Sequence, residues 1–172
     1  DDLHRLDGRG KHVLGQLQVA LAVALIGKND PVGAEAAARA AIALLPGSPS
    51  AHFYRGLALR DLNRRGEALA ELQAALQISG DNRIRVNVAQ LLAEMARFEE
   101  AAQVFASVPE GVPERGIARR DLGVIYINRL HRVQEGVAAL QEAAALEKDP
   151  REAAMIRSEV ARLSGGVRAR TP

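Results

Sequence analysis

The histidines are the side chains in this sequence best suited to metal binding or to proton transfer at neutral pH. They are His4, His12, His52 and His131. A zinc site on a helix would use two of them four residues apart, and a general base would need a carboxylate nearby to orient it. No two have this spacing, and none adjoins an evident cluster of carboxylates. We therefore expect surface or boundary histidines and no metal site.

The carboxylates, glycines and cysteines give no stronger indication of catalysis. The candidate carboxylate pairs are Glu99 with Glu100 and Glu114 with Asp121, all on helix faces that we predict to be exposed. The glycines near the N-terminus follow no predicted strand, which a phosphate-binding loop would require. Cysteine is absent, so disulfides and thiolate chemistry are excluded. The sequence predicts a protein that is not an enzyme and has no cofactor.

The arginines could indicate an RNA contact instead. The densest basic clusters are Arg55, Arg60, Arg64 and Arg65, and then Arg115, Arg119 and Arg120. RNA recognition by helical repeats uses stacking aromatic rings, and Phe53 and Tyr54 are the only such rings near a cluster. The net charge of +2 is also too small to favour a polyelectrolyte contact. RNA binding is thus the disfavoured alternative, and no nucleic-acid partner is expected.

The elements that position these side chains are predicted to be helices throughout. The composition is 48% apolar, mostly Ala, Leu and Val, with 3% aromatic residues, which suits closely packed helices. No segment alternates with a period of two, so no strand is expected. The longest apolar stretch, 13–27, is too short to cross a bilayer. Breaks at Pro, Gly, Asn and Asp predict helices over 12–27, 31–45, 50–62, 67–78, 83–96, 98–108, 114–130, 133–147 and 151–164.

Small residues recur in pairs with a period of about 34 residues. The pairs are Ala22 with Ala34, Gly56 with Ala68, Ala89 with Ala101, and Gly123 with Gly136. Because two helices cross closely only where neither carries a bulky side chain, these pairs predict four stacked helix hairpins. The repeats cover about 15–48, 49–81, 82–115 and 116–150, within a single domain over 12–164. Residues 1–11 are expected to be a polar lead-in, and 165–172 a basic tail.

This pattern resembles the tetratricopeptide repeat family. The best match is the second repeat, with the run Ser50–Leu59 followed by Gly66-Glu67-Ala68-Leu69, and the resemblance spans about 15–150. The chain departs from the family where an early aromatic is usual, with Gln18, His52, Arg85 and Arg119 in that place, and the fourth repeat has one extra residue in its turn. The resemblance implies an all-α, right-handed α-solenoid of antiparallel hairpins. Residues 151–164 resemble the helix that caps such arrays.

The resemblance also implies a concave groove lined by the first helix of each repeat. Its expected lining is Val19, Val23, Ile26, Phe53, Leu57, Arg60, Arg83, Val86, Asn87, Gln90, Arg120, Val124, Ile127 and Asn128. This groove would be apolar in its first half and positive in its second, and it would take a peptide or partner helix with apolar anchors and an acidic group. Alternatively, the apolar half is covered by the chain's own N-terminal segment or by neighbouring protein. Oligomerisation through the edge hairpins is also open.

The function expected from these features is that of a non-catalytic protein–protein interaction scaffold. Two alternatives stay open: a periplasmic or secretion-system adaptor or chaperone, and a repeat domain appended to a larger enzyme. A cysteine-free chain suits either the bacterial cytoplasm or the periplasm. The residues do not indicate which protein is the partner.

Overall fold

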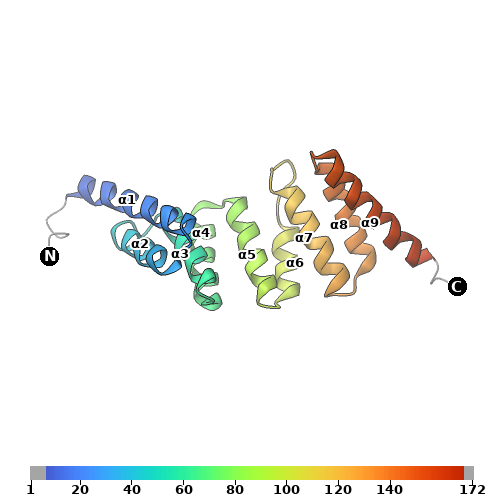
Figure 1. Ribbon diagram of the computed structural model, residues 1–172, viewed down its shortest axis with the longest axis horizontal. Helices are drawn as coiled ribbons and strands as arrows, with labels where there is room; N and C mark the ends of the chain where they lie inside the picture. Colours follow the sequence, from blue (N-terminus) through green and yellow to red (C-terminus); the bar gives the residue numbers. More distant parts are fainter. Residues whose placement is uncertain (1–6, 169–172) are drawn as a thin grey trace. The chain divides into compact units, whose positions relative to one another are not determined.

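The computed structural model describes the backbone of residues 7–168 and the side chains up to residue 165. Every regular element in 7–168 is a helix, as Figure 1 shows. The helices are α1 (Gly8–Gly27), α2 (Pro31–Leu44), α3 (Pro49–Asp61), α4 (Arg65–Ser79), α5 (Asn82–Glu94), α6 (Phe98–Ala106), α7 (Arg115–Asn128), α8 (Val133–Leu146) and α9 (Pro150–Arg168). The prediction of an all-α fold of helix hairpins is confirmed.

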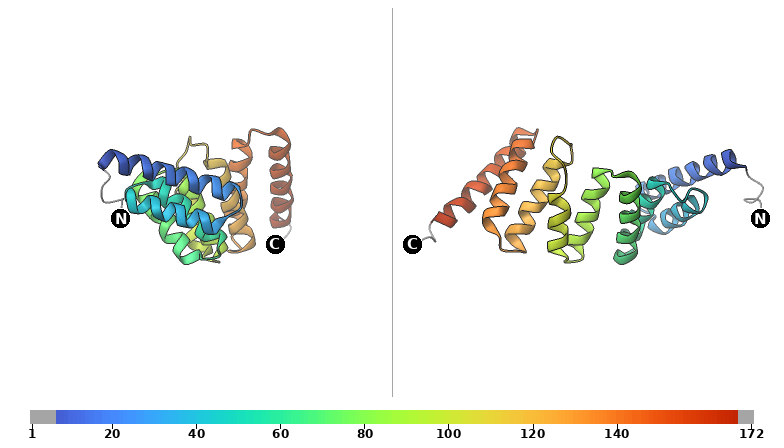
Figure 2. Two further views of the ribbon diagram at one scale, coloured as in Figure 1. Left: turned by 60° about the vertical axis from the view of Figure 1, so that its left-hand side comes forward. Right: turned by 180° about the vertical axis from the view of Figure 1, so that it is seen from behind.

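The chain divides into two compact units, residues 1–84 and 85–172. In the first unit α1 packs on α2 and α3 packs on α4, while α1 and α2 both contact α3. In the second unit α6 packs on α7, α7 on α8, and α8 on α9. Helix α5 lies mostly in the second unit, and α8 and α9 lie side by side in both views of Figure 2. Each unit is thus built from successive antiparallel helices joined by short turns.

The small residues predicted at the helix crossings are all buried. The α7–α8 crossing is the closest fit: a Cβ atom on Gly136 would lie 2.9 Å from the Gly123 carbonyl oxygen, and one on Gly123 would lie 3.0 Å from that of Gly136. At Gly56 the facing carbonyl oxygen, that of Ala68, is farther away, at 3.3 Å, and the nearest atom is Leu72 Cγ at 2.8 Å. The two glycines of the last repeat therefore let the backbones themselves approach.

The four turns inside the hairpins share one backbone feature. Each contains a single residue in the left-handed region, at φ angles of 58°, 60°, 59° and 55°: Asn29, Asn63, Ala96 and His131. In the first three turns the next amide donates to a carbonyl five residues earlier, at 2.9 Å. In the fourth, the Arg132 amide donates to the Tyr126 carbonyl, six residues earlier. The extra residue predicted in that turn is confirmed.

The two ends of the helical region differ from the prediction. Helix α1 begins at Gly8, because the Asp7 carboxylate accepts a hydrogen bond from the Gly10 amide at 2.7 Å and caps the helix there. Helix α9 continues to Arg168, so the glycines at 165–166 do not end it. Residues 1–6, which include His4, and 169–172 lie outside the described part of the chain. The other helix boundaries agree with the prediction within two residues.

Helix α1 is also longer than the 13–27 stretch from which no membrane span was expected. It is a 20-residue helix that is apolar and long enough to cross a membrane by length and composition alone. A buried core helix and a signal sequence pass the same test, so one such helix does not establish a span. In the structure α1 packs on α2 and α3, with Gly15, Val19 and Ala22 buried.

Candidate functional site

The residues of the first unit predicted to line a groove have unequal exposure. Val19 is buried against Ala41 and Ala51, so it packs the hairpins and presents no binding surface. Val23 is exposed, whereas Ile26 and Leu57 are half-buried. Phe53 is half-buried too, with its ring edge-on to that of Tyr54 at 5.2 Å between centroids. The partly exposed members are placed where a ligand could reach them, and their role stays a prediction.

The basic members of the predicted groove have acidic neighbours in sequence. Arg83 is exposed and lies 3.2 Å from Asp81 Oδ2, and Arg60 Nε lies 3.8 Å from Asp61 Oδ1. Both arginines can therefore be partly neutralised without a ligand, which weakens the predicted preference for an acidic group.

The structure brings two predicted residues of the second unit together. Gln90 on α5 and Val124 on α7 line one pocket of ≈ 420 Å³, with Phe98 and Phe105 from α6. We call this the α5–α7 pocket; its lining is completed by Ala93, Glu94, Asp121, Ile125 and Arg129. The other predicted residues of this unit lie elsewhere. Val86 is buried in the core, Asn87 and Ile127 are half-buried, and Asn128 is exposed.

The α5–α7 pocket combines an apolar floor with polar groups from two helices. Phe105 and Ile125 are buried beneath it, and the side chain of Val124 remains 46% exposed. Across the pocket, Gln90 Nε2 donates a hydrogen bond of 3.0 Å to Asp121 Oδ2. This bond joins α5 to α7, so the amide and the carboxylate are held in fixed positions at the pocket wall.

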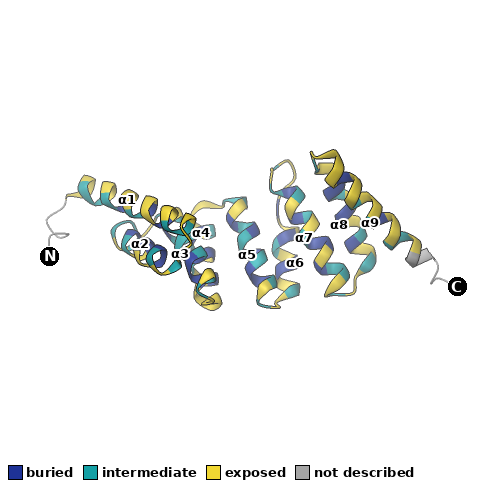
Figure 3. Cartoon of the chain, viewed as in Figure 1, coloured by how far each residue is buried: buried dark blue, intermediate teal, exposed yellow. Residues whose placement is uncertain are grey.

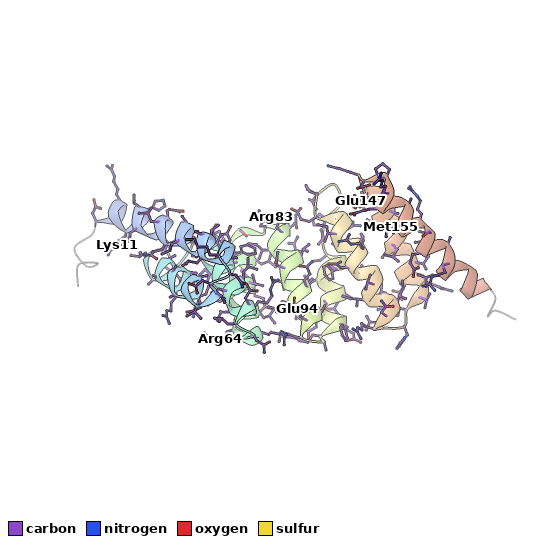
Figure 4. The ribbon with its side chains drawn as sticks, in the orientation of Figure 1. Lys11, Arg64, Arg83, Glu94, Glu147 and Met155 are labelled. Atoms are coloured by element: carbon purple, nitrogen blue, oxygen red, sulfur yellow. The ribbon has the colours of Figure 1, made fainter. Side chains whose placement is uncertain are left out.

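The charge of the α5–α7 pocket differs from the prediction for this half of the chain. Glu94, labelled at the end of α5 in Figure 4, is exposed and has no ion pair with any described residue. The single cation in the lining, Arg129, lies over the Phe98 ring at 5.3 Å from its centroid. Arg120, predicted to make the groove positive, lines a different pocket of ≈ 220 Å³ with Ile117 and Lys148. The lining itself thus holds two carboxylates, Glu94 and Asp121, and one cation, while Arg120 Nε lies 4.0 Å from Asp121 Oδ1.

A polar cluster inside the first unit was missed by the sequence analysis. His52 Nδ1 lies 2.7 Å from Glu71 Oε2, and its Nε2 lies 3.0 Å from the Pro46 carbonyl oxygen. Arg55 joins the same group, with Nε 3.0 Å from Glu35 Oε1 and Nη1 2.6 Å from Glu71 Oε1. The expectation that no histidine adjoins carboxylates was wrong for His52. The cluster links α2, α3 and α4 through hydrogen bonds and ion pairs, so we interpret it as a structural contact between helices.

A related ion-pair group holds the start of α7. Arg115 is buried, with Nε 2.6 Å from Glu142 Oε1 on α8, and it also donates to the Val108 carbonyl. Arg119 Nε lies 2.8 Å from the other oxygen of Glu142. Two of the arginines considered for RNA contact are therefore engaged inside the second unit. One signal in the sequence could have revealed both groups. Where the family usually has an early aromatic residue, this chain has a polar one, His52 in the second repeat and Arg119 in the fourth. This substitution is more than a departure from the family pattern, because a polar side chain at a core-facing position needs a hydrogen-bonding partner.

A third set of ion pairs recurs at helix N-termini, where α4, α6 and α8 follow an arginine. Arg64 and Glu67 pair through two hydrogen bonds of 2.8 and 2.6 Å, and Arg97 pairs with Glu100 through two of 2.6 Å. Arg132 and Glu135 form the same arrangement. The hydrogen bonds from the guanidinium groups hold the pKa of Glu67 and of Glu100 below the ordinary glutamate value. These pairs are exposed.

Within residues 7–168, no group of three or more His, Asp or Glu side chains is arranged so that it could hold a metal ion.

Comparison with known proteins agrees with this geometry. A sequence model of the family described as tetratricopeptide repeat matches residues 19–83. This segment of the chain therefore carries tetratricopeptide repeat sequence. The match lies within the first unit and begins inside α1, and the likeness of the remainder to tetratricopeptide repeat proteins is one of fold. A comparison with curated protein sequences finds no match.

Solved structures of low sequence identity share the fold. The chain is 19% identical to PilF of Pseudomonas aeruginosa, with 91% of this chain and 72% of that chain covered at a TM-score of 0.77. A tetratricopeptide repeat protein from Parabacteroides merdae is 20% identical, with coverages of 88% and 60% and a TM-score of 0.75. An O-GlcNAc transferase from Thermobaculum terrenum is 18% identical, with coverages of 81% and 27% and a TM-score of 0.70. Tetratricopeptide repeats are generally protein-interaction scaffolds without catalytic activity, and the transferase activity is a property of that enzyme.

Proposed function

We propose that this chain is a non-catalytic scaffold of the tetratricopeptide repeat kind, whose α5–α7 pocket holds a segment of a partner protein. The observation that carries the proposal is the pocket itself, which unites two residues predicted to contact a ligand, Gln90 and Val124, over a floor of buried aromatic and aliphatic side chains. An apolar hollow with a few fixed polar groups is the usual form of a binding site.

The chemistry of the partner segment follows from the lining. A partner side chain the size of Leu or Phe would cover Val124 and contact Phe98, removing apolar surface from water. The carboxylates of Glu94 and Asp121 flank this position; Arg129 in the lining and Arg120, 4.0 Å from Asp121, balance them in part, and Glu94 is left without an ion pair among the described residues. We therefore infer an apolar anchor with Lys or Arg close to it, in place of the acidic group expected from the sequence.

The test is a selection of peptides from a random phage-displayed library on the intact chain. We expect enriched sequences to combine an apolar residue with a nearby Lys or Arg, and we expect Val124→Glu to abolish their capture because it puts a charge on the apolar wall. The matched control is Val32→Glu on α2, an equally drastic change at a position that is 66% exposed and outside the pocket. If the two variants capture the enriched peptides equally, the pocket is not the docking site.

A second pair of variants tests the charge preference separately. Glu94→Gln should weaken capture of peptides that contain Lys or Arg and leave their uncharged analogues unaffected, because it removes a carboxylate without changing the shape of the pocket. Enrichment of acidic peptides would contradict the inferred partner chemistry, even if Val124→Glu still abolishes binding.

A further inference from the structure

Helix α1 carries an apolar stripe that nothing in the described part of the chain covers. Val13, Leu17 and Leu21 follow one another at intervals of one helical turn and are 58%, 60% and 47% exposed. Figure 3 shows exposed residues along the same helix, and the opposite side of α1 is the one that packs on α2. Three large exposed side chains in line on one helix are unusual for a free surface.

The repeat register identifies what kind of surface this stripe is. Counting from the buried small residue of each first helix, Leu17, Leu21 and Ala24 correspond to Ala51, Arg55 and Ala58 on α3 and to Ala118, Leu122 and Ile125 on α7. On α3 and α7 these positions are covered within their own units: Ala51 packs with Val19 and Ala41 of the preceding hairpin, and Arg55 pairs with Glu35 of α2. On α1 all three are exposed. The stripe is therefore a helix-packing face of the repeat without its partner helix.

The residues around the stripe restrict the chemistry of an occupant. No charged residue lies between Lys11 and Lys28, so an ion pair cannot attract or orient a partner along this face. An occupant must itself present an uncharged apolar helix face about two turns long. At the other end of the chain, α9 does not offer one, because Met155 is its single exposed large apolar side chain among the described residues (Figure 4).

We propose that the stripe pairs with the stripe of a second copy of this chain, in an antiparallel α1–α1 contact. The stripe is its own complement: in an antiparallel pair centred on Leu17, Val13 of one copy lies opposite Leu21 of the other. Small side chains at Ala20 and Ala24 border the contact and allow the helices to approach. Because this is a two-fold contact, it closes as a dimer.

Cysteine cross-linking gives a sharp test, since the chain has no cysteine of its own. Leu17→Cys should form a disulfide-linked dimer on mild oxidation, because position 17 meets its own copy at the two-fold axis. Val13→Cys alone should not, since its two copies would be offset by about 12 Å along the helices, which is beyond the reach of a disulfide. A mixture of Val13→Cys and Leu21→Cys should form the mixed dimer, and Met155→Cys on α9, at a position that is 72% exposed, should stay uncross-linked.

Sedimentation equilibrium of the cysteine-free chain provides the quantitative measurement. We expect a monomer–dimer equilibrium in which Leu17→Glu raises the dissociation constant by about a hundredfold or more, because each dimer loses the burial of two leucines. Circular dichroism checks that the helix content of the variant is unchanged. A chain that stays monomeric at its highest soluble concentration would overturn the proposal. Self-linking of Val13→Cys would also overturn it, because that result indicates a parallel or unspecific contact. A monomer that sediments with phosphatidylglycerol vesicles, but no longer does so as Leu17→Glu, would overturn it as well, because the stripe would then bind a lipid surface.

Discussion

Substitution of Gly136 by alanine tests the close helix crossing on which the last hairpin depends. A Cβ atom at this position would lie 2.9 Å from the Gly123 carbonyl oxygen and 2.5 Å from Ile127 Cγ1. The isoleucine side chain can rotate away, whereas the carbonyl belongs to the backbone of α7 and can move only with the helix. Helices α7 and α8 must therefore separate locally to accept the methyl group.

The expected magnitude is the difference between two opposing effects. Overpacking a well-packed contact costs about 1–3 kcal/mol, and a backbone obstacle favours the upper part of that range. Alanine is better than glycine inside a helix by about 1 kcal/mol, which offsets part of this cost. We therefore expect Gly136→Ala to lower the free energy of unfolding by about 1–2 kcal/mol.

Urea unfolding followed by circular dichroism measures this quantity. The matched control is Gly66→Ala on α4, where no atom lies within 4 Å of the new Cβ, so that helix propensity alone should act and stability should rise slightly. Gly56→Ala should fall between the two, because only the Leu72 side chain and a more distant carbonyl oppose it. The reasoning fails if Gly136→Ala is as stable as Gly66→Ala.

Three further predictions use the same unfolding assay or a titration. Ala96→Asn should raise the free energy of unfolding by about 0.5–1 kcal/mol, because Ala96 has a φ of 59° and asparagine tolerates this left-handed conformation better; an unchanged midpoint would contradict it. Glu71→Gln should lower stability by about 1–3 kcal/mol, since it leaves the half-buried Arg55 guanidinium and the His52 ring without the carboxylate that they share, while Glu67→Gln at an exposed pair should have a much smaller effect. Glu100 has a pKa below its ordinary value because Arg97 donates hydrogen bonds to its carboxylate. Its contribution to stability is therefore present above the unfolded-state pKa of about 4.3 and is lost as the pH falls through the lower folded-state pKa. In an NMR titration, Arg97→Gln should raise the pKa of Glu100, and an unchanged pKa would refute this cause.

The hairpins could be predicted from sequence because their determinants are local or strictly periodic. Capping residues such as Asp30, with Pro31 after it, fix where a helix starts, and the small residues at crossings fix the register of the repeat. The ends were less predictable. Glycine at 165–166 weakens a helix without ending it, and the Asp7 cap extended α1 into a stretch with no apolar periodicity.

The candidate site was predictable only in part, because sequence position fixes a helix face less precisely than it fixes a helix. Gln90 and Val124 do meet in one pocket, but Val19 is turned into the core and Arg120 lines another pocket. The cluster around His52 was invisible for a different reason: its partners come from three helices, and which carboxylate reaches which cation depends on side-chain packing.

The claim that the α5–α7 pocket is a docking site is tested most directly by isothermal titration calorimetry with a selected peptide. The decisive quantity is the ratio of two dissociation constants, that of the Val124→Glu variant divided by that of the intact chain. Burial of a valine-sized contact predicts a ratio of at least about tenfold, with Val32→Glu remaining close to the intact chain. A ratio near one for Val124→Glu, with the peptide still bound tightly, would contradict the account.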